Sequence, residues 1–588
     1  MARDTVMKKP KDTRGALRRI LRYLGPWKYV IAAVALLSVM SNLLNLWGPS
    51  LAGSAIREAA AGAGKVNFDA VKHFAGLMLL CYLGSALIGF DISLIMTVVS
   101  KRVARRMRQD VFEKLMRLPV GYFDRHQAGD IISRVSYDID VISTSMATDI
   151  TQILSSVVTV VGSLVMMFTI SPPLSALTLV TVPVSVIYTV TMRKKTQPRY
   201  AKRSKNYGIL NGFVEEELSG QKTILAYAYE DRVDERFDGI NKEAADSFSD
   251  AEYYGVTIGP TMTAINNLGL SLIALLGGVL FLNGQIDLGR ISSFVLYSRK
   301  FAGPINAVAE VFNELFSALA ASERVFALLD EDEESTDAKN AFLLENIRGD
   351  VIAEHVAFGY DPDKTILRDL NLAAPAGELT AIVGPTGAGK TTIINLLMRF
   401  YDPDSGVIRI DGHEIRTAVR RSVRSSYAMM LQDTWVFQGT IFENIAYGKA
   451  DATMEEVVAA AKAARIHSFI MRLPLGYDTV ISEDGGNISK GQKQLLTIAR
   501  AMLYDAPMLI LDEATSNVDT ATEREIQKAM RELMKQKTCF VIAHRLSTIE
   551  NADRILVLRD GDVVEQGTHR ELMDQKGFYY QLYAAQFE

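Results

Sequence analysis

The chain has 588 residues, too many for one hydrophobic core, so at least two domains are expected. Hydrophobic residues make up 48% of it and the mean hydropathy is +0.11, which is high for a soluble protein and low for a wholly membrane-embedded one. The small net charge of -4 argues against nucleic acid as a partner, and two cysteines, Cys81 and Cys539, are too few for a disulfide framework, which favours a reducing compartment.

The first 23 residues are basic and precede an apolar stretch, an outline that a signal peptide shares. No small-residue cleavage site follows, and further apolar stretches do. We therefore expect a cytoplasmic segment that leads into a first membrane span.

Six stretches before residue 320 are apolar over about the 20 residues that a helix needs to cross a membrane. They cover 30–50, 74–99, 150–170, 174–192, 258–282 and 291–312. Clusters of Lys and Arg follow the second and fourth stretches, and the positive-inside rule places such clusters in the cytoplasm. Residues 1–330 are thus predicted to form an all-α transmembrane domain with both chain termini on the cytoplasmic side.

The two long connections, 100–149 and 193–257, are charged and have helical periodicity. We expect them to continue the spans into the cytoplasm as helices, with breaks near 118–130 and 226–237. A short helix at each break could dock on another domain. A solvated helical hairpin without a partner is the alternative, and the length of the connections argues against it.

Two cations, Arg299 and Lys300, fall inside the last predicted span, and Asn266 and Asn267 fall inside the fifth. Such groups are costly in a membrane, so two interpretations stay open. Either they pair with one another or with the backbone, or Arg299 or Lys300 faces a water-filled cavity and contacts a transported substrate.

The sequence changes character after Asp330. Residues 331–348 are polar and charged and are predicted to be a linker. From 349 to 588, short β-rich stretches alternate with helical ones, which is typical of an α/β domain built on a mainly parallel sheet.

The strongest motif in the chain is GPTGAGKTT, which matches the phosphate-binding loop pattern GxxxxGK[ST] between a β-rich stretch and a helical one. Glycines allow successive backbone N–H groups to surround phosphates. We expect Lys390 to reach the β- and γ-phosphates of ATP and Thr391 to bind Mg²⁺. The predicted nucleotide-binding residues of this loop are Gly384, Pro385, Thr386, Gly387, Ala388, Gly389, Lys390, Thr391 and Thr392.

A second stretch, PMLILDEATS, is an apolar strand that ends in the carboxylates Asp512 and Glu513. Asp512 suits the Mg²⁺ shell, and Glu513 could polarise a water for attack on the γ-phosphate. Together with the phosphate loop, this pair predicts ATP hydrolysis.

With these motifs in place, the chain resembles an ABC transporter of the exporter type over essentially its whole length. The stretch ISKGQKQLLTIARAML (488–503), which begins with ISKGQ, resembles the family's signature, LSGGQ in its common form. By the same resemblance, Tyr360 is the aromatic residue that stacks on adenine and Gln432 is the glutamine that faces the metal and the attacking water. Asp519 resembles the D-loop aspartate, and His544 the switch histidine near the γ-phosphate.

The resemblance implies that two ATPase domains face each other head to tail, with each ATP between the phosphate loop of one and the signature of the other. The signature residues expected beside the partner's nucleotide are Ser489, Lys490, Gly491 and Gln492. The breaks in the cytoplasmic helices resemble coupling helices, which carry closure of the ATPase domains into the membrane. One chain supplies half of each site, so a second half-transporter is expected as a partner.

One departure from the family pattern bears on whether the partner is a different chain or a second copy of this one. Lys490 replaces the third-position glycine of the signature, while Glu513 and His544 are kept. This combination resembles one half of a heterodimeric bacterial multidrug exporter in which one of the two sites hydrolyses ATP poorly. The alternative is a homodimer that tolerates the lysine.

The expected function is ATP-driven export of small amphipathic molecules or lipids across the plasma membrane, with ATP and Mg²⁺ as cofactors. Peptide export, siderophore-type import on the exporter fold, and an ATP-gated channel or regulator are alternatives. The start of the first span near residue 28 argues against an N-terminal peptidase domain and thus against leader-cleaving peptide export.

Overall fold

The computed structural model describes residues 12–60, 62, 65–361, 363–431, 434–482, 486–512, 520–543 and 549–587. It divides into two compact units near Glu333, a helical unit and a sheet unit. The short segment Pro119–Arg125 belongs to the sheet unit, although helical-unit residues flank it in the sequence.

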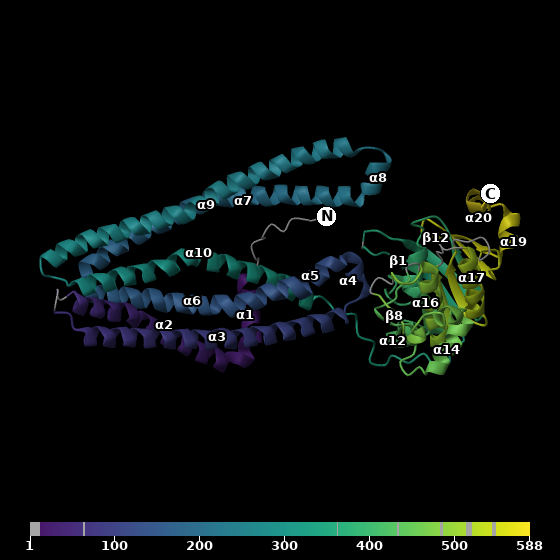
Figure 1. The fold of residues 1–588 in the computed structure, drawn as a ribbon. Coiled ribbons are helices and arrows are strands. Elements are labelled where there is room, and N and C mark those ends of the chain that lie inside the picture. The colour runs from purple at the N-terminus through teal and green to yellow at the C-terminus, as the bar shows by residue number, and fades with distance from the viewer. Residues whose placement is uncertain are drawn as a thin grey trace. The chain divides into compact units, whose positions relative to one another are not determined.

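The helical unit consists of long helices that pack side by side in pairs. Its long helices are α2 (Lys28–Ala59), α3 (Phe68–Leu115), α6 (Ile139–Ile170), α7 (Pro172–Ser219), α9 (Glu230–Leu282) and α10 (Leu288–Asp330). The shorter elements are α1 (Thr13–Leu24), a 3-10 turn at Gly25–Trp27, α5 (Ala128–Ser133), a π-helix at Arg134–Asp138 and α8 (Gln221–Ala226). Helix α2 runs along α3, α6 along α10, and α7 along α9 (Figure 1).

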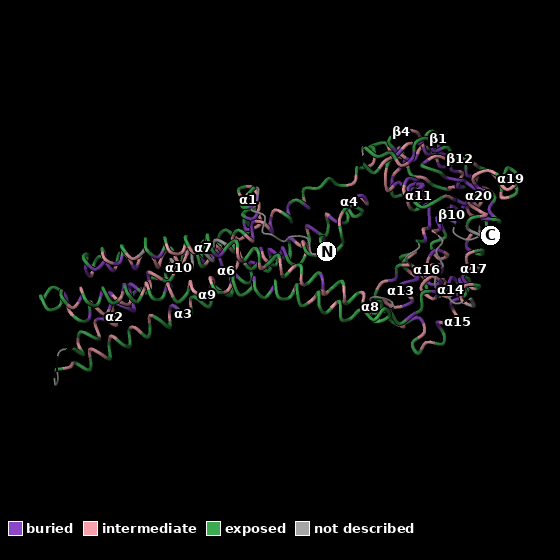
Figure 2. The backbone as a smooth tube through the Cα atoms, turned by 90° about the horizontal axis from the view of Figure 1, so that it is seen from above, coloured by how far each residue is buried: buried purple, intermediate pink, exposed green. Residues whose placement is uncertain are grey.

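Among the described residues, five helical stretches are long and apolar enough to cross a membrane: Thr13–Ala59, Phe68–Leu115, Ala128–Ile170, Pro172–Ser219 and Glu230–Leu282. Only 11% to 24% of the residues in their most apolar windows are buried, and Figure 2 shows exposed residues along much of these helices. Exposed leucines on α3 include Leu79, Leu80, Leu83 and Leu87. An apolar surface of this extent needs a lipid environment.

The sixth predicted span lies in α10, which is not among those five. Helix α10 has 43 residues and is long enough to cross, but Arg299 and Lys300 lower the hydropathy of its apolar stretch. The predicted breaks correspond to short helices: α4 (Val120–Arg125) and α5 lie in the first, and α8 ends where the second was placed.

The main sheet of the sheet unit has six strands in the order β12-β11-β3-β10-β9-β6. Their bounds are β3 Leu379–Val383, β6 Tyr427–Met430, β9 Met508–Asp512, β10 Thr538–Ile542, β11 Arg554–Arg559 and β12 Asp562–Gly567. All neighbours pair in parallel except β12 with β11. The carboxyl ends of β3, β10, β9 and β6 therefore meet at one edge, the usual place for a ligand in such a sheet.

A second, antiparallel sheet was not expected from the sequence. Its order is β2-β1-β4-β5, with β1 Val351–Phe358, β2 Leu367–Ala374, β4 Ser405–Ile410 and β5 His413–Glu414. A two-stranded pair, β7 (Gly439–Thr440) with β8 (Val480–Ile481), completes the strands. The described helices are α11 Lys390–Leu397, α12 Arg420–Ser425, α13 Ile441–Ala446, α14 Met454–Ala463, α15 His467–Ile470, α16 Lys490–Tyr504, α17 Thr520–Met534, α19 His569–Gln575 and α20 Phe578–Phe587, with a 3-10 turn at Gly476–Asp478.

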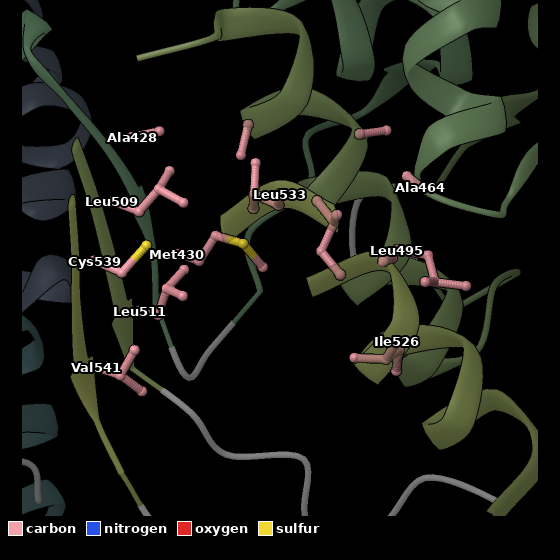
Figure 3. Close-up of a cluster of buried hydrophobic side chains, with 14 of the residues drawn as sticks. Ala428, Met430, Ala464, Leu495, Leu509, Leu511, Ile526, Leu533, Cys539 and Val541 are labelled. Atoms are coloured by element: carbon pink, nitrogen blue, oxygen red, sulfur yellow. The ribbon is translucent and has the colours of Figure 1, made fainter. Parts of the chain in front are cut away.

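The largest core of the sheet unit joins the parallel strands to α16 and α17. Leu509, Leu511 and Val541 from the strands belong to the same cluster as Leu495 and Ile526 from these helices (Figure 3). The strands are buried along nearly their whole length, as expected of a covered parallel sheet. This packing fixes the carboxyl ends of the strands.

The segment predicted as a linker makes specific contacts with α12. Arg424 donates to Glu334 with an Nη1–Oε2 distance of 3.0 Å. Arg420 donates to the Ser335 carbonyl (2.9 Å), and its backbone N–H donates to Asp337 (3.1 Å). The start of this segment is therefore held against the sheet unit by ion pairs and hydrogen bonds.

Candidate functional site

The phosphate loop lies between β3 and α11 and depends on three glycines. Gly387 and Gly389 have φ angles of 85° and 103°, a left-handed conformation that side chains disfavour. A Cβ on Gly384 would lie 2.4 Å from the Leu558 carbonyl oxygen in β11. The loop thus reaches the start of α11 with backbone N–H groups open to an anion.

Lys390 is the first residue of α11. Its Nζ donates to the carbonyls of Gly384 (2.7 Å) and Pro385 (3.0 Å), so the side chain curls over its own loop. Burial lowers the pKa of Lys390, and the Asp512 carboxylate opposes that shift. The lysine and the carboxylate at the end of β9 therefore interact at the same edge of the sheet, as their predicted roles require.

The oxygen donors near this edge suit Mg²⁺. Thr391 is exposed beside Lys390 in the first turn of α11, and Asp512 ends β9. Hydroxyl and carboxylate oxygens are hard ligands that Mg²⁺ accepts, usually together with waters and substrate phosphates. No cluster of three His, Cys, Asp or Glu suited to a metal occurs among the described residues.

Tyr360 is held against the phosphate-loop helix by two hydrogen bonds. Its hydroxyl donates to Thr392 Oγ1 (3.3 Å) and accepts from Asn395 Nδ2 (2.9 Å). The ring stands edge-on to Tyr401, with centroids 5.1 Å apart, and stays 43% exposed. An aromatic face is thus available next to the loop that would hold the phosphates.

The signature residues begin α16. Ser489 caps this helix: its backbone N–H donates to Gln492 Oε1 (2.8 Å) and its hydroxyl accepts from the Gln492 N–H (3.3 Å). Gly491 is buried, whereas Ser489 and Lys490 are exposed. Within the described part of the chain, no hydrogen bond or ion pair joins these residues to the phosphate loop.

Four predicted site residues lie outside the described residues: Gln432, Glu513, Asp519 and His544. Two residues that precede them in the sequence, Asp512 and Ala543, lie at or next to the carboxyl ends of β9 and β10. The placement of those four side chains is left as a prediction.

Two contacts of the sheet unit were missed by the sequence analysis. Tyr401 packs on Tyr360 and donates a hydrogen bond to Asp124 in α4. Arg500 in α16 donates to the carbonyls of Asn444 (2.8 Å) and Trp435 (3.2 Å). Neither residue belongs to a recognisable motif, so no pattern in the sequence pointed to it.

The helical unit contains a cavity of about 270 Å³ between α7, α9 and α10. Its lining is mixed: hydroxyls and amides from α7 and α9 share it with apolar side chains and with Arg299. Asn266 and Asn267, the polar residues noted in the fifth predicted span, both line this cavity.

The Lys300 side chain binds to helix α2 and not to the cavity. Its Nζ donates to the Asn45 carbonyl (2.8 Å) and to the Asn45 side-chain oxygen. Pro49 has no N–H and therefore leaves that carbonyl, four residues before it in α2, without its helical partner. Tyr297, one turn earlier on α10, donates to the Leu46 carbonyl (2.6 Å). Lys300 thus compensates a proline break, and Arg299 faces the cavity.

Comparison with known proteins decides the family. Residues 31–305 match the family model described as the ABC transporter transmembrane region. Residues 367–516 match the family model described as ABC transporter. The chain is 44% identical to the ABC transporter ATP-binding protein YfiC of Bacillus subtilis (strain 168), over 99% of this chain and 96% of that one. The chain belongs to the ABC transporter family.

Two further similarities define its type. This ABC transporter is 45% identical to a fatty acid ABC transporter ATP-binding/permease protein of Mycobacterium bovis, over 88% of this chain and 82% of the relative. The structure of a bacterial Atm1-family ABC exporter with ATP bound superposes with a TM-score of 0.75 and 30% identity, covering 98% of this chain and 99% of that one.

These findings confirm the predicted fold class: a helical transmembrane domain fused to an ABC ATPase domain in an exporter-type ABC transporter. They also confirm the predicted activity, ATP hydrolysis coupled to transport by a multi-pass membrane protein.

Proposed function

We propose that this exporter moves small amphipathic molecules or lipids out across the bacterial plasma membrane as one half of a dimer, with both chain termini in the cytoplasm. The cavity between α7, α9 and α10 carries this proposal, because it combines polar and apolar lining within the membrane domain. The name of the mycobacterial relative, a fatty acid transporter, favours lipid-like substrates.

The nucleotide site supplies the energy for alternating access. The phosphate loop and Lys390 hold the phosphates, and Tyr360 offers its ring to adenine. Thr391, Asp512 and Gln432 are the groups proposed to hold Mg²⁺, which would neutralise phosphate charge. Glu513, with His544 beside the γ-phosphate, would align the attacking water.

Two protomers are required because each chain contains half of each nucleotide site. Ser489 and Lys490 at the start of α16 are exposed and can complete the surroundings of a γ-phosphate bound to the other protomer, and Asp519 is expected at the same interface. ATP then holds the two ATPase domains together, and hydrolysis releases them.

Lys490 favours a dimer of two different chains over a homodimer. It is exposed in the first turn of α16, so a long cationic side chain stands where the family has only a glycine backbone. We propose that this signature completes the weaker of two sites. The phosphate loop and Glu513 of this chain would form the stronger site with the signature of a second half-transporter.

ATPase measurements test this arrangement. The chain alone in lipid should hydrolyse ATP slowly, and a co-expressed partner should raise the rate. Glu513→Gln should abolish that activity, whereas Lys490→Gly should increase it and Lys490→Arg, which keeps the length and charge, should not. Rapid hydrolysis by the chain alone, unchanged in Lys490→Gly, would show a homodimer.

Export itself is tested with inside-out vesicles that contain the transporter. ATP should drive a fluorescent fatty acid into the vesicle lumen, and the Glu513→Gln variant should not support this uptake. Active ATP hydrolysis without movement of any amphipathic probe would contradict the proposed function.

A further inference from the structure

Arg299 has no anionic partner in the part of the molecule that the structure describes. It is exposed to the cavity and makes no ion pair with a described residue, and no Asp or Glu lines the cavity. A cation within a membrane span is costly unless a counter-charge or water compensates it. This arginine therefore lacks the structural compensation that Lys300 obtains from Asn45.

The rest of the lining suits one end of an amphiphile. Ser185 from α7 and Asn266 and Asn267 from α9 add hydroxyl and amide groups that can donate to an anion, whereas the Thr181 hydroxyl already donates to the Thr178 carbonyl. Leu270 and Phe301 supply apolar surface in the same cavity. The lining thus offers a positive, hydrogen-bonding part beside an apolar part.

The size and the chemistry of the cavity limit what it can hold. Its volume of about 270 Å³ lies near the lower end of the range of small-molecule sites, about 300–1,000 Å³. It therefore accommodates a head group with part of a chain. Arginine binds carboxylate and phosphate oxygens through two parallel hydrogen bonds, a geometry that a neutral or cationic head group cannot use.

We propose that Arg299 is the specificity-determining residue of the transport site and selects amphiphiles with an anionic head group, a carboxylate or a phosphate. The inference rests on the proposed export function, because it assigns a substrate class to the same cavity. The anion would neutralise Arg299, and the Ser185 hydroxyl of α7 and the side-chain amides of Asn266 and Asn267 would bind its remaining oxygens.

Direct binding to the purified transporter in phosphatidylcholine nanodiscs tests this assignment. The probes are radiolabelled dodecanoate, dodecyl phosphate and methyl dodecanoate, which share one chain and differ in the head group. The wild type should bind at least one anionic probe about 10-fold more tightly than the ester. Arg299→Gln should remove that preference, and Arg299→Lys should keep part of it.

Arg290→Gln is the matched control. Arg290 lies on the same helix near Asp287, outside the cavity lining, and is more than half exposed. It should bind all three probes like the wild type. A circular dichroism spectrum and a gel-filtration profile identical to those of the wild type show that each variant is folded.

The possible results separate the inference from the function on which it rests. A preference for dodecanoate identifies a carboxylate site, and a preference for dodecyl phosphate identifies a phosphate site. Each preference supports the inference if the Arg299→Gln variant no longer shows it. Equal binding of ester and anion, or a preference that persists in Arg299→Gln, overturns it. Selective binding through Arg299 without ATP-driven movement of the probe in vesicles would leave the inference standing and overturn export.

Discussion

Arg299 and Lys300 are adjacent residues on α10, but their side chains have different neighbours and different roles. Consecutive residues of an α-helix point about 100° apart, so two adjacent cations on α10 face different neighbours. Lys300 meets the carbonyl that Pro49 leaves free in α2, and Arg299 meets the cavity. The sequence marked both residues as unusual for a membrane span. It could not assign the roles, because the rotation of α10 is set by its packing against α2 and α6.

Cys539 provides a pH-dependent prediction for the sheet unit. It lies inside β10, and burial raises the pKa of its thiol from 9.0 to about 12. A raised folded-state pKa contributes stability below the unfolded pKa, and that stability is lost as the pH rises. Between pH 8 and pH 10.5 this thiol should therefore lower the free energy of unfolding by about 2 kcal/mol.

The measurement compares the thermal unfolding midpoint of the wild type and of Cys539→Val at pH 8 and pH 10.5. Valine fills similar space in a buried strand and does not ionise. Tyrosines that titrate in this range contribute equally to both proteins, so the wild type should lose more stability on alkalinisation than the variant. Equal losses would show that the thiol does not ionise on unfolding.

Four described helices of the sheet unit begin with a capping box, and a comparison of two of them separates the stabilising role of a cap from a role in ATP hydrolysis. Ser489 with Gln492 caps α16, and Thr453 with Glu456 caps α14. Ser489→Ala and Thr453→Ala should each lower the free energy of unfolding by about 1 kcal/mol. Only Ser489→Ala should also lower kcat for ATP, because only that cap belongs to the signature. Urea unfolding checks the stability of the two variants, and steady-state ATPase assays check their kcat. An equal fall in kcat in Ser489→Ala and Thr453→Ala would show that the Ser489 cap affects ATP hydrolysis through stability alone.

Helix α4 connects to the candidate adenine site through Tyr401. A Cβ on Gly121 would lie 3.0 Å from the Tyr401 ring, the Tyr401 hydroxyl donates to Asp124, and the ring packs on Tyr360. Tyr401→Phe keeps the ring and removes the hydrogen bond, whose net value is about 1 kcal/mol. We expect the ATPase rate to stay within about twofold of the wild type. Substrate moved per ATP should fall, because α4 is held less firmly.

The control for this change is Tyr504→Phe. The Tyr504 hydroxyl donates to the Ser425 carbonyl (3.0 Å), a bond of the same kind with no contact to α4 among the hydrogen bonds of the described residues. Vesicle transport and ATPase rates measured in parallel give the ratio for each variant. An unchanged ratio in Tyr401→Phe would exclude this hydrogen bond from coupling.

The elements differ in how far the sequence specified them. Apolar length was sufficient to locate α2, α3, α6, α7 and α9, and the phosphate-loop pattern was sufficient to locate β3 and α11. The antiparallel sheet was not foreseen, because β4 pairs with β1 across β3, the phosphate loop and α11. Strand pairing over that separation leaves no local pattern. The Tyr401 contacts were missed for the same reason.

At the scale of the whole molecule, the turn that joins α7 to α9 through α8 (Figure 1) carries exposed apolar side chains. Among the described residues, the phosphate loop and the signature make no hydrogen bond or ion pair with each other. Leu225, Tyr227 and Tyr229 at this turn are 58%, 78% and 44% exposed. The segments around them are charged, so lipid does not explain this apolar surface.

We therefore expect the second protomer to cover α8. Leu225→Asp places a charge in that contact, and an unpaired buried charge is strongly unfavourable. The variant should shift the transporter toward monomers in mass photometry of dilute detergent-solubilised protein, and it should lose substrate-stimulated ATPase activity. Lys222→Asp, on the same exposed helix, changes charge without removing apolar surface and should do neither. If Leu225→Asp assembles and responds to substrate like Lys222→Asp, then α8 faces solvent in the dimer and closure reaches the membrane domain through α4 alone.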